Sequence, residues 1–146
     1  MIELKEIHDL NLINAIMLNE FVLDDISDDA AKGVFLTELP SWMNFFGVFD
    51  DGVCVGFYAT HMQNSVTVEI HTTLLPSCRG KKALKAGEFI VSLLLSRHKK
   101  IISYIAEYNK KALVYAQMMG FEIEGTIKDS FLKNGKLYNQ YLVGRS

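Results

Sequence analysis

The chain has 146 residues, of which 49% are hydrophobic and 22% charged, and its formal net charge is −2. This length and composition suit one globular domain with a buried core and exclude a disordered chain. No apolar run is long enough to cross a bilayer, and the opening stretch MIELKEIHDL lacks the basic head and apolar body of a secretory signal.

Strand and helix patterns alternate along the whole chain without repeats or a low-complexity linker. Asp51-Gly52 and Asn134-Gly135 are signals for tight hairpin turns, Asp9 or Asn11 can cap the first helix, and Gly120 can end the last one. The predicted elements are a strand at 2–7, helices at 8–26 and 27–36, a hairpin at 44–62, a strand at 65–75, a helix at 83–98, a strand at 101–108, a helix at 109–121 and a hairpin at 121–144. The helix at 83–98 has an apolar face, which consists of Leu84, Phe89, Ile90, Leu93 and Leu94.

Charge is divided unevenly between the two halves of the chain. Residues 1–73 contain twelve Asp or Glu against two Lys or Arg, a balance of −10, whereas residues 74–146 contain five against thirteen, a balance of +8. Such a division predicts two surfaces of opposite charge.

The stretch LLPSCRGKKALKAGEF, at 74–89, opens the basic half. A strand feeds a tight turn that begins a helix, and a helix N-terminus offers unpaired N–H groups and partial positive charge. Arg79, Lys81 and Lys82 add full charges, and Gly80 lets the backbone come close to a ligand. The stretch therefore predicts a site for a phosphate-bearing ligand, although an ordinary basic loop would have the same residues. It has neither the Walker nor the Rossmann glycine spacing.

Three stretches resemble motifs of the GNAT superfamily of acyl-CoA-dependent N-acetyltransferases. VEIHTTLLPSCRGKKALKAG is similar to the motif in which an apolar strand and a proline precede R-x-x-G-x-[GA]. NKKALVYAQMMGFEIEG is similar to the later motif N-x-[KR]-A, helix, G-F, and KDSFLKNGKLYNQYLV to the closing hairpin. The chain departs from the first motif at Lys82 and Leu84, where the family has glycine and then glycine or alanine.

The resemblance implies one α/β (α+β) domain over residues 1–146, with a mixed central sheet of about seven strands, helices on both faces and the order β-α-α-β-β-β-α-β-α-β-β. It implies acetyl-CoA as the co-substrate, with pantetheine between splayed central strands and the pyrophosphate at the helix start. It also leaves a homodimer open. The implied cofactor-binding residues are Leu74, Leu75, Arg79, Gly80, Lys81, Lys82, Ala83, Leu84, Asn109 and Tyr115.

Acetyl transfer requires that the amine lose a proton and that the thiolate gain one. Glu69 lies at the position where the family often places a base, and His71 shares its face of a regular strand, so the two are candidates for base and relay. The family's usual acid, a tyrosine, corresponds to Ala116, so the neighbouring Tyr115 is the candidate here. Each of the three also has a structural interpretation. Glu69 can be a buried acid with hydrogen-bond partners, His71 a polar residue that faces inward, and Tyr115 an aromatic residue of the core.

We expect a primary amine of cationic type as acceptor, bound at the acidic half near Asp24, Asp25, Asp28, Asp29 and Glu38, with Trp42 in its wall or in the core. The alternative is a catalytically inactive binding or structural module of the same fold. Nucleic-acid contact is weakly supported, because aromatic and basic residues do not interleave on one strand. No membrane partner is expected, and the four histidines show no metal-ligand spacing, so no metal is expected. Cys54 and Cys78 lack metal or redox spacing, which favours free thiols in the cytoplasm.

Overall fold

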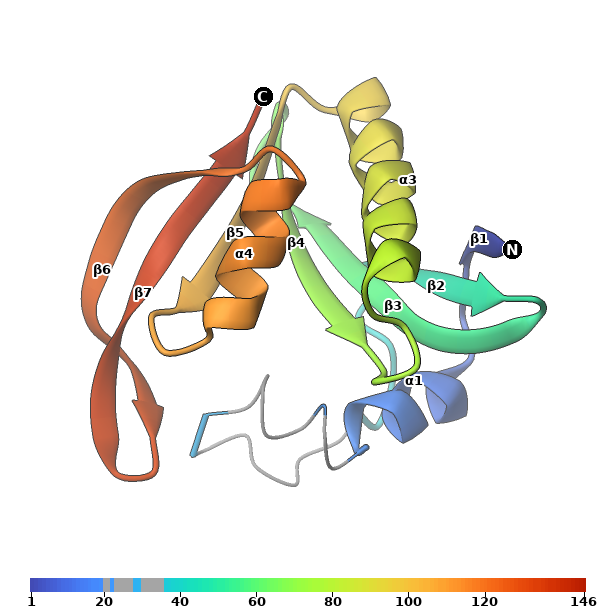
Figure 1. Ribbon diagram of the computed structural model, residues 1–146, viewed down its shortest axis with the longest axis horizontal. Helices are drawn as coiled ribbons and strands as arrows, with labels where there is room; N and C mark the ends of the chain where they lie inside the picture. Colours follow the sequence, from blue (N-terminus) through green and yellow to red (C-terminus); the bar gives the residue numbers. More distant parts are fainter. Residues whose placement is uncertain (20–21, 23–27, 30–35) are drawn as a thin grey trace.

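The computed structural model describes residues 1–19, 22, 28–29 and 36–146. Seven strands form one mixed sheet in the order β1-β2-β3-β4-β5-β7-β6 (Figure 1). The elements are β1 (Ile2–Glu6), α1 (Leu10–Met17), β2 (Asn44–Asp50), β3 (Val53–Met62), β4 (Thr67–Leu74), α3 (Lys81–Arg97), β5 (Lys100–Ala106), α4 (Lys110–Met118), β6 (Glu122–Lys133) and β7 (Lys136–Arg145). No helix in these ranges is long and apolar enough to span a membrane.

This order confirms the predicted fold class and the arrangement of strands and hairpins. Both predicted hairpin turns have left-handed backbone at both central positions, with φ of 48° and 86° at Asp51-Gly52 and 52° and 73° at Asn134-Gly135. Asp9 caps α1, because its side chain accepts a hydrogen bond from the amide of Leu12 at 3.1 Å. The helix predicted at 27–36, and the part of the first predicted helix beyond residue 19, fall mostly outside the described residues.

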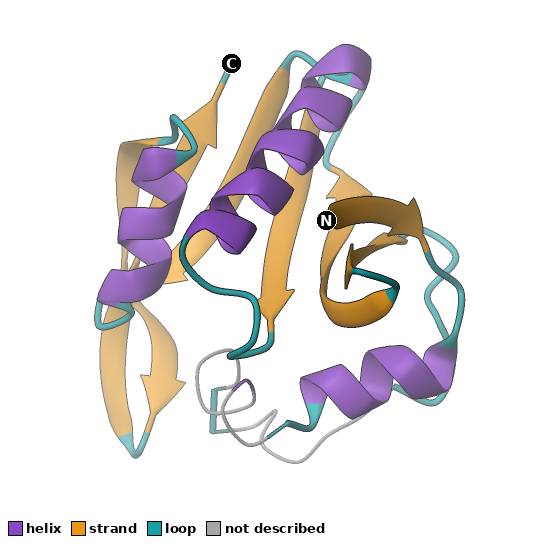
Figure 2. Ribbon diagram, turned by 45° about the vertical axis from the view of Figure 1, so that its right-hand side comes forward, coloured by secondary structure: helices purple, strands orange, loops and turns teal. Residues whose placement is uncertain are grey.

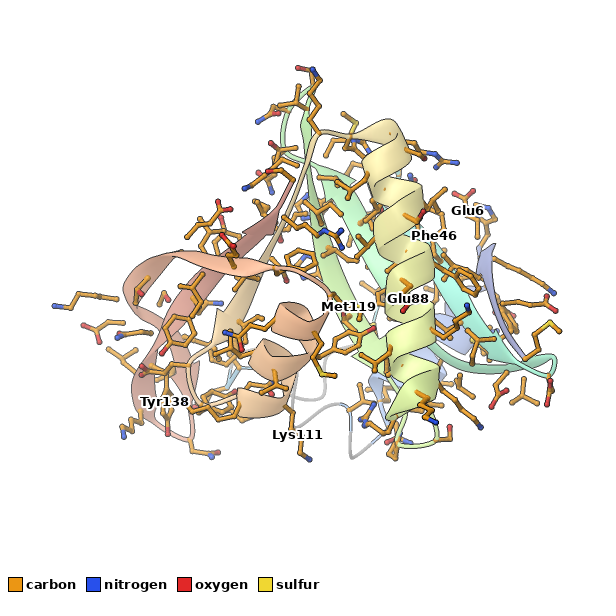
Figure 3. All side chains as sticks on the ribbon, turned by 45° about the horizontal axis from the view of Figure 1, so that its top comes forward. Glu6, Phe46, Glu88, Lys111, Met119 and Tyr138 are labelled. Atoms are coloured by element: carbon orange, nitrogen blue, oxygen red, sulfur yellow. The ribbon has the colours of Figure 1, made fainter. Side chains whose placement is uncertain are left out.

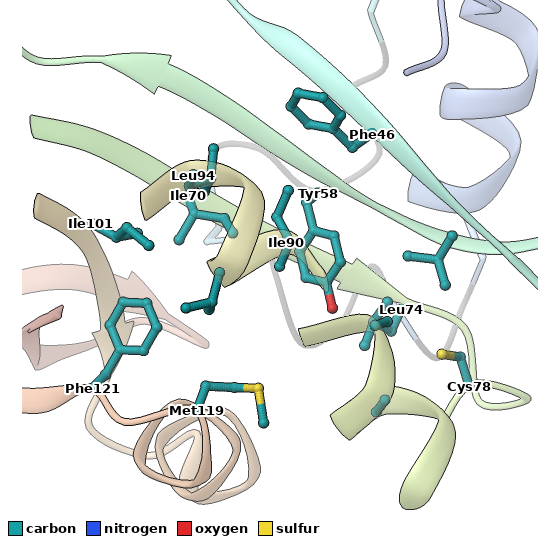
Figure 4. Close-up of a cluster of buried hydrophobic side chains, with 14 of the residues drawn as sticks. Phe46, Tyr58, Ile70, Leu74, Cys78, Ile90, Leu94, Ile101, Met119 and Phe121 are labelled. Carbon is teal, nitrogen blue, oxygen red and sulfur yellow. The ribbon is translucent and has the colours of Figure 1, made fainter. Parts of the chain in front are cut away.

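The sheet separates two apolar cores. Helices α3 and α4 cover one face, where Tyr58, Ile70, Ile90 and Leu94 belong to the larger cluster (Figure 4). Helix α1 lies on the opposite face, near the smaller cluster of Ile7, Ile13, Phe45, Phe57 and Ala59 (Figure 2). Because side chains of a strand alternate between faces, β3 contributes Tyr58 to the first core and its neighbours Phe57 and Ala59 to the second.

The apolar face of α3 was predicted correctly in part. Ile90 and Leu94 are buried, and the helix begins at Lys81, two residues before the predicted start. Phe89, in contrast, is 37% exposed, and the ammonium group of Lys85 lies 5.1 Å from the centre of its ring. The helix also buries small residues against α4 and the sheet, among them Ala83, Ala86 and Gly87. The buried face of α3 therefore contains fewer large side chains than the apolar pattern predicts.

The two central strands separate shortly after they meet. β4 and β5 pair in parallel over Thr67–Glu69 and Lys100–Ile102 only. One residue further on, the Ser103 hydroxyl donates to the carbonyl oxygen of Ile70 at 2.9 Å. Beyond that bridge the backbone edges of β4 and β5 face a gap, which is the main irregularity of the sheet.

Strand β4, which bounds this gap with one edge, is held in place at its other edge by close contact with β3. A Cβ built on Gly56 would lie 2.6 Å from the Thr73 carbonyl oxygen and 2.9 Å from the Leu74 Cα, both backbone atoms. We expect Gly56→Ala to lower the free energy of unfolding by about 1–3 kcal/mol, because β3 and β4 must move apart. Gly125→Ala is the control, since a Cβ there meets no atom within 4 Å. Urea denaturation measures both, and equal stability of the two variants would contradict the prediction.

Candidate active site

A cavity of about 930 Å³ occupies the gap between β4 and β5 and continues beneath the start of α3. Its walls come from the C-terminal half of β4, the N-terminus of α3, the last residues of β5, and α4. At the α1 end the described residues of the wall are apolar, namely Met17, Val22, Leu36, Met43, Phe45 and Phe57. The cavity is therefore long, open at the centre of the sheet and bordered by backbone on two sides.

Backbone groups of β4 point into the gap at alternate residues. The Leu75 amide donates to the Val55 carbonyl on β3 at 2.9 Å. The backbone groups of Thr73, two residues earlier, therefore also point toward β3, whereas those of Thr72 and Leu74 point into the gap. Leu75 has its carbonyl occupied as well, because Arg79 donates to it. Thr72 and Leu74 thus face the gap, whereas Leu75 faces β3. The carbonyl of Leu74 also accepts from Arg79, so the amide is the backbone group that Leu74 directs at the gap.

The loop before α3 has the features of an anion site. Gly80 is the N-cap residue, with φ of +62° and no side-chain hydrogen bond to the first turn. The first α3 amide with a carbonyl partner in the described chain is that of Leu84, which donates to Gly80. The preceding amides therefore point out of the helix end. Arg79, Gly80, Ala83 and Leu84 all line the cavity, so the predicted anion-binding loop lies on its wall.

Arg79 shapes this loop from within. Its Nη1 donates to the carbonyl oxygens of Leu74, Leu75 and Cys78, at 3.0, 3.1 and 3.1 Å. One guanidinium thereby ties the end of β4 to the start of α3. Arg79 still lines the cavity, but its hydrogen bonds in this structure hold the turn between β4 and α3 in shape.

The two lysines of the loop point elsewhere. Neither Lys81 nor Lys82 lines the cavity, and the Lys82 ammonium forms an ion pair of 2.6 Å with Asp50 at the end of β2. The hydrogen bond from Lys82 lowers the pKa of Asp50. The family resemblance implied that Lys81 and Lys82 bind the cofactor, whereas in the structure neither lines the cavity and Lys82 is paired with Asp50 beside the β2–β3 hairpin.

Helix α4 supplies polar groups on the other side of the gap. Asn109 lies on the cavity wall, and its side chain caps α4 by accepting from the Ala112 amide at 3.2 Å. Lys110 and Lys111 also line the cavity, and Lys111 lies at the N-terminal end of α4 (Figure 3). Neither lysine was among the predicted site residues, although Lys111 is the basic residue of the N-x-[KR]-A motif in the sequence.

Glu69 and His71 form a polar cluster on the face of the sheet that bears α1. Glu69 is 7% exposed, and its Oε2 lies 2.8 Å from His71 Nε2 and 3.3 Å from His61 Nε2. His71 lines the cavity and Glu69 lies behind it. Partial withdrawal from water lowers the pKa of His71, although the attraction of Glu69 opposes this. The predicted pair is thus in direct contact, and His61 joins it from β3.

Tyr115 is committed to the packing of α4 on α3. Its hydroxyl donates to the Ala83 carbonyl at 2.7 Å and accepts from the Tyr58 hydroxyl at 2.7 Å. Burial raises the pKa of Tyr115 to about 12 and raises the pKa of Tyr58 as well, so both hydroxyls keep their protons. A Cβ on Gly87 would lie 2.6 Å from the Tyr115 hydroxyl, which shows how close the two helices are.

The predicted acceptor side is described only in part. Asp24 and Asp25 lie outside the described residues. Asp29 accepts hydrogen bonds from the amides of Asn134 and Gly135, at 2.7 and 2.8 Å, and so holds the tip of the β6–β7 hairpin. Trp42 is 65% exposed and meets the His61 ring edge-on, with centroids 5.3 Å apart. Among the described residues that line the cavity, none is acidic.

Solved structures of N-acetyltransferases have the same fold over the whole chain. A chimera of Vibrio cholerae spermidine N-acetyltransferase SpeG and hSSAT has a TM-score of 0.79 at 19% identity, covering 98% of this chain and 93% of that chain. The V. cholerae spermidine N-acetyltransferase in complex with CoA and spermine gives 0.68 at 20% identity, covering 99% and 94%. A protein provisionally described as a phosphinothricin N-acetyltransferase gives 0.76 at 17% identity, covering 100% and 98%.

This similarity establishes that the chain has the GNAT fold, which confirms the fold that the family resemblance implies. The chain belongs to the family described as "Protein of unknown function (DUF2824)", which matches residues 13–143. A search of curated protein sequences finds no match.

The tyrosine pair can be tested as a structural element. We expect Tyr115→Phe to lower the free energy of unfolding by about 1–3 kcal/mol, because the buried Tyr58 hydroxyl loses its acceptor. The double variant with Tyr58→Phe should lose less than the sum of the two single variants, since the two hydroxyls share one interaction. Denaturant unfolding measures the cycle, with Tyr138→Phe on the β6–β7 hairpin as control (Figure 3). Strict additivity would contradict the pairing.

Proposed function

We propose that the protein is an acetyl-CoA-dependent N-acetyltransferase that acts on a primary amine. The observation that carries this proposal is the gap between β4 and β5, which continues as a cavity to the open N-terminus of α3. A channel bordered by two strand edges that no longer pair with each other, and ending at a helix N-terminus, suits a ligand with an amide-containing arm and a phosphate group. The fold shared with N-acetyltransferases supports the same conclusion.

The residues at the cavity fit acetyl-CoA, which would supply an acetyl thioester. Thr72 would pair with the pantetheine arm through its backbone groups and Leu74 through its amide, because the Leu74 carbonyl accepts from Arg79. The first amides of α3 would receive the pyrophosphate. Lys110 and Lys111 add positive charge at the opposite wall. Apart from Thr72, these residues belong to the basic half of the chain, residues 74–146.

The Glu69–His71 pair is the candidate proton acceptor for the amine. His71 borders the cavity, and Glu69 can orient its ring and compensate its charge from 2.8 Å away. Glu69 therefore acts through His71, because the carboxylate itself does not reach the wall. Tyr115 is not assigned as the acid, since its hydrogen is donated to Ala83.

The acceptor we propose is an amine with an alkyl body, of the polyamine kind. The apolar wall near α1 can bury methylene groups, and Leu36 in that wall is fixed by two hydrogen bonds with the Asn14 side chain, of 2.8 and 2.9 Å. The excess of acidic residues in the first half favours a cationic acceptor. Among the proteins with the same fold, the spermidine N-acetyltransferase was crystallised with spermine. The reaction would take place in the cytoplasm, which suits the free thiols Cys54 and Cys78.

A binding module without turnover is the second candidate. Two observations favour it: Ala116 occupies the place of the usual tyrosine, and the neighbouring Tyr115 is engaged in helix packing. Such a module would still bind the cofactor at the same cavity. Binding and turnover must therefore be measured separately.

Binding of acetyl-CoA is the first test. We expect saturable binding by calorimetry and a higher melting temperature in its presence, because a ligand of the folded state stabilises that state. Arg79→Ala should weaken binding by about 1–3 kcal/mol, since the turn that presents the α3 amides loses its internal tie and a positive charge. Arg97→Ala, at the other end of the same helix, removes the same charge and should change little. Absence of binding at millimolar acetyl-CoA would rule out both candidates.

The second test concerns turnover with a panel of polyamines and alkylamines. We expect Glu69→Gln and His71→Gln each to lower kcat by about 10²–10⁴ while the affinity for acetyl-CoA stays unchanged. His8→Gln, an exposed histidine before α1, is the matched control. A wild-type rate in both variants between about pH 6 and pH 9 would assign the pair a structural role. Wild-type protein that binds acetyl-CoA but acetylates no amine would favour the binding module.

A further inference from the structure

The pairing of β3 with β4 places three metal-binding side chains on one face of the sheet. His61 lies directly opposite Glu69 in the antiparallel register, and His71 pairs with Ala59 two positions along. Residues two apart on a strand share a face, and so do directly opposite residues on neighbouring strands. His61, Glu69 and His71 therefore converge, and their ligand atoms all lie within 4.8 Å of one another.

Two of the three distances within this group match the separation between the ligand atoms of a bound metal ion. The separations are 2.8 Å from Glu69 Oε2 to His71 Nε2, 3.3 Å from Glu69 Oε2 to His61 Nε2, and 3.4 Å between the two Nε2 atoms. A tetrahedral Zn²⁺ with bonds of about 2.0–2.1 Å places its ligand atoms about 3.3–3.4 Å apart. The two separations that involve His61 Nε2 have this length already, and the distance from Glu69 Oε2 to His71 Nε2 would have to increase by about half an ångström.

Neighbouring side chains support the three ligands. Gln63 Nε2 donates to Glu69 Oε1 at 2.7 Å, which fixes the carboxylate and leaves Oε2 directed at the two histidines. Trp42 packs edge-on against the His61 ring, and the His61 and His71 rings are stacked with centroids 5.6 Å apart. Outer contacts of this kind orient ligands and raise metal affinity.

We propose that His61, Glu69 and His71 form a binding site for one divalent transition-metal ion of the Zn²⁺ class. Two imidazoles and one carboxylate suit zinc and its first-row neighbours better than Mg²⁺ or Ca²⁺, which prefer oxygen ligands. Three protein ligands leave one coordination position for water or another small ligand. The linear spacing of the histidines gave no indication of this site, because it forms across two strands.

This inference does not rest on the proposed acetyl transfer, although it uses the same face of β4. His71 would bind the metal ion through Nε2, and its other ring nitrogen, Nδ1, would then carry the hydrogen of the neutral ring, so neither nitrogen could accept a proton from an amine. The metal-bound and the proton-accepting states of His71 therefore exclude each other. Metal binding is measured on the protein alone, so its failure leaves the proposed function untouched.

The alternative is a purely hydrogen-bonded group, in which both Nε2–H groups donate to Glu69. Such a group explains the two contacts with the carboxylate, at 2.8 and 3.3 Å. It does not require the two Nε2 atoms to approach each other to 3.4 Å. Metal titration separates the two interpretations directly.

The experiment is a calorimetric titration of the chelator-treated full chain with Zn²⁺. We expect one saturable site per chain. His61→Ala and His71→Ala should each weaken binding at least about 100-fold, and Gln63→Ala about 10–100-fold through the loss of its support. His8→Ala and Cys54→Ser, at a histidine and a thiol outside the group, should bind like the wild type. Circular dichroism establishes that each variant is folded.

Co²⁺ provides a second measurement that needs no variant. Its visible absorption reports coordination number, and we expect the spectrum of a four- or five-coordinate site in the wild-type chain. Zn²⁺ should remove that spectrum by competition. Absence of saturable binding at millimolar Zn²⁺ would overturn the proposal, and so would a single site that persists in both the His61 and the His71 variants.

Discussion

The separation of β4 and β5 is the constraint on which the rest of the structure depends. The two strands pair over three residues each, and the Ser103–Ile70 hydrogen bond is their last bridge. Beyond that point the backbone groups at the edges of both strands need other partners, because buried N–H and C=O groups are costly when unpaired. A cavity bordered by such groups is suited to a ligand that has amides of its own, and the start of α3 places an anion site at its end.

The side chains of β4 alternate between the two faces of the sheet, so the strand contributes to the core on one face and to a polar cluster on the other. Val68, Ile70 and Leu74 pack into the core beneath α3, whereas Glu69 and His71 lie on the opposite face. A buried carboxylate is tolerated only when its oxygens have partners, and here Gln63 serves one oxygen and the histidines the other. The same strand thus stabilises the domain and presents the polar group on which both proposals rest.

Features set by local backbone geometry were predicted well from the sequence. The two hairpin turns and the Asp9 cap depend on residues next to each other in the chain, and the shared face of Glu69 and His71 follows from strand alternation. Features set by distant contacts were not. His61 joins the cluster only through the β3–β4 register, and Lys82 turns away from the cavity because Asp50, 32 positions earlier, offers it a partner. The position of a residue in the sequence reveals neither which residue lies opposite it in a neighbouring strand nor which distant side chain it pairs with.

Tyr115 of α4 has a structural role, although the family's catalytic tyrosine would stand only one position later in the helix. No residue of α4 is fully buried, so its place beside α3 depends on contacts at the edge, among them the hydrogen bond from Tyr115 to Ala83. A phenol has a single hydrogen, and because Tyr115 donates it to a carbonyl, Tyr58 must be the donor between the two hydroxyls. One step along the helix rotates a side chain by about 100°, which separates Tyr115 from the direction of Ala116. Any acetyl transfer by this chain must therefore take the proton for the thiolate from another group, or first break the hydrogen bond that joins the two helices.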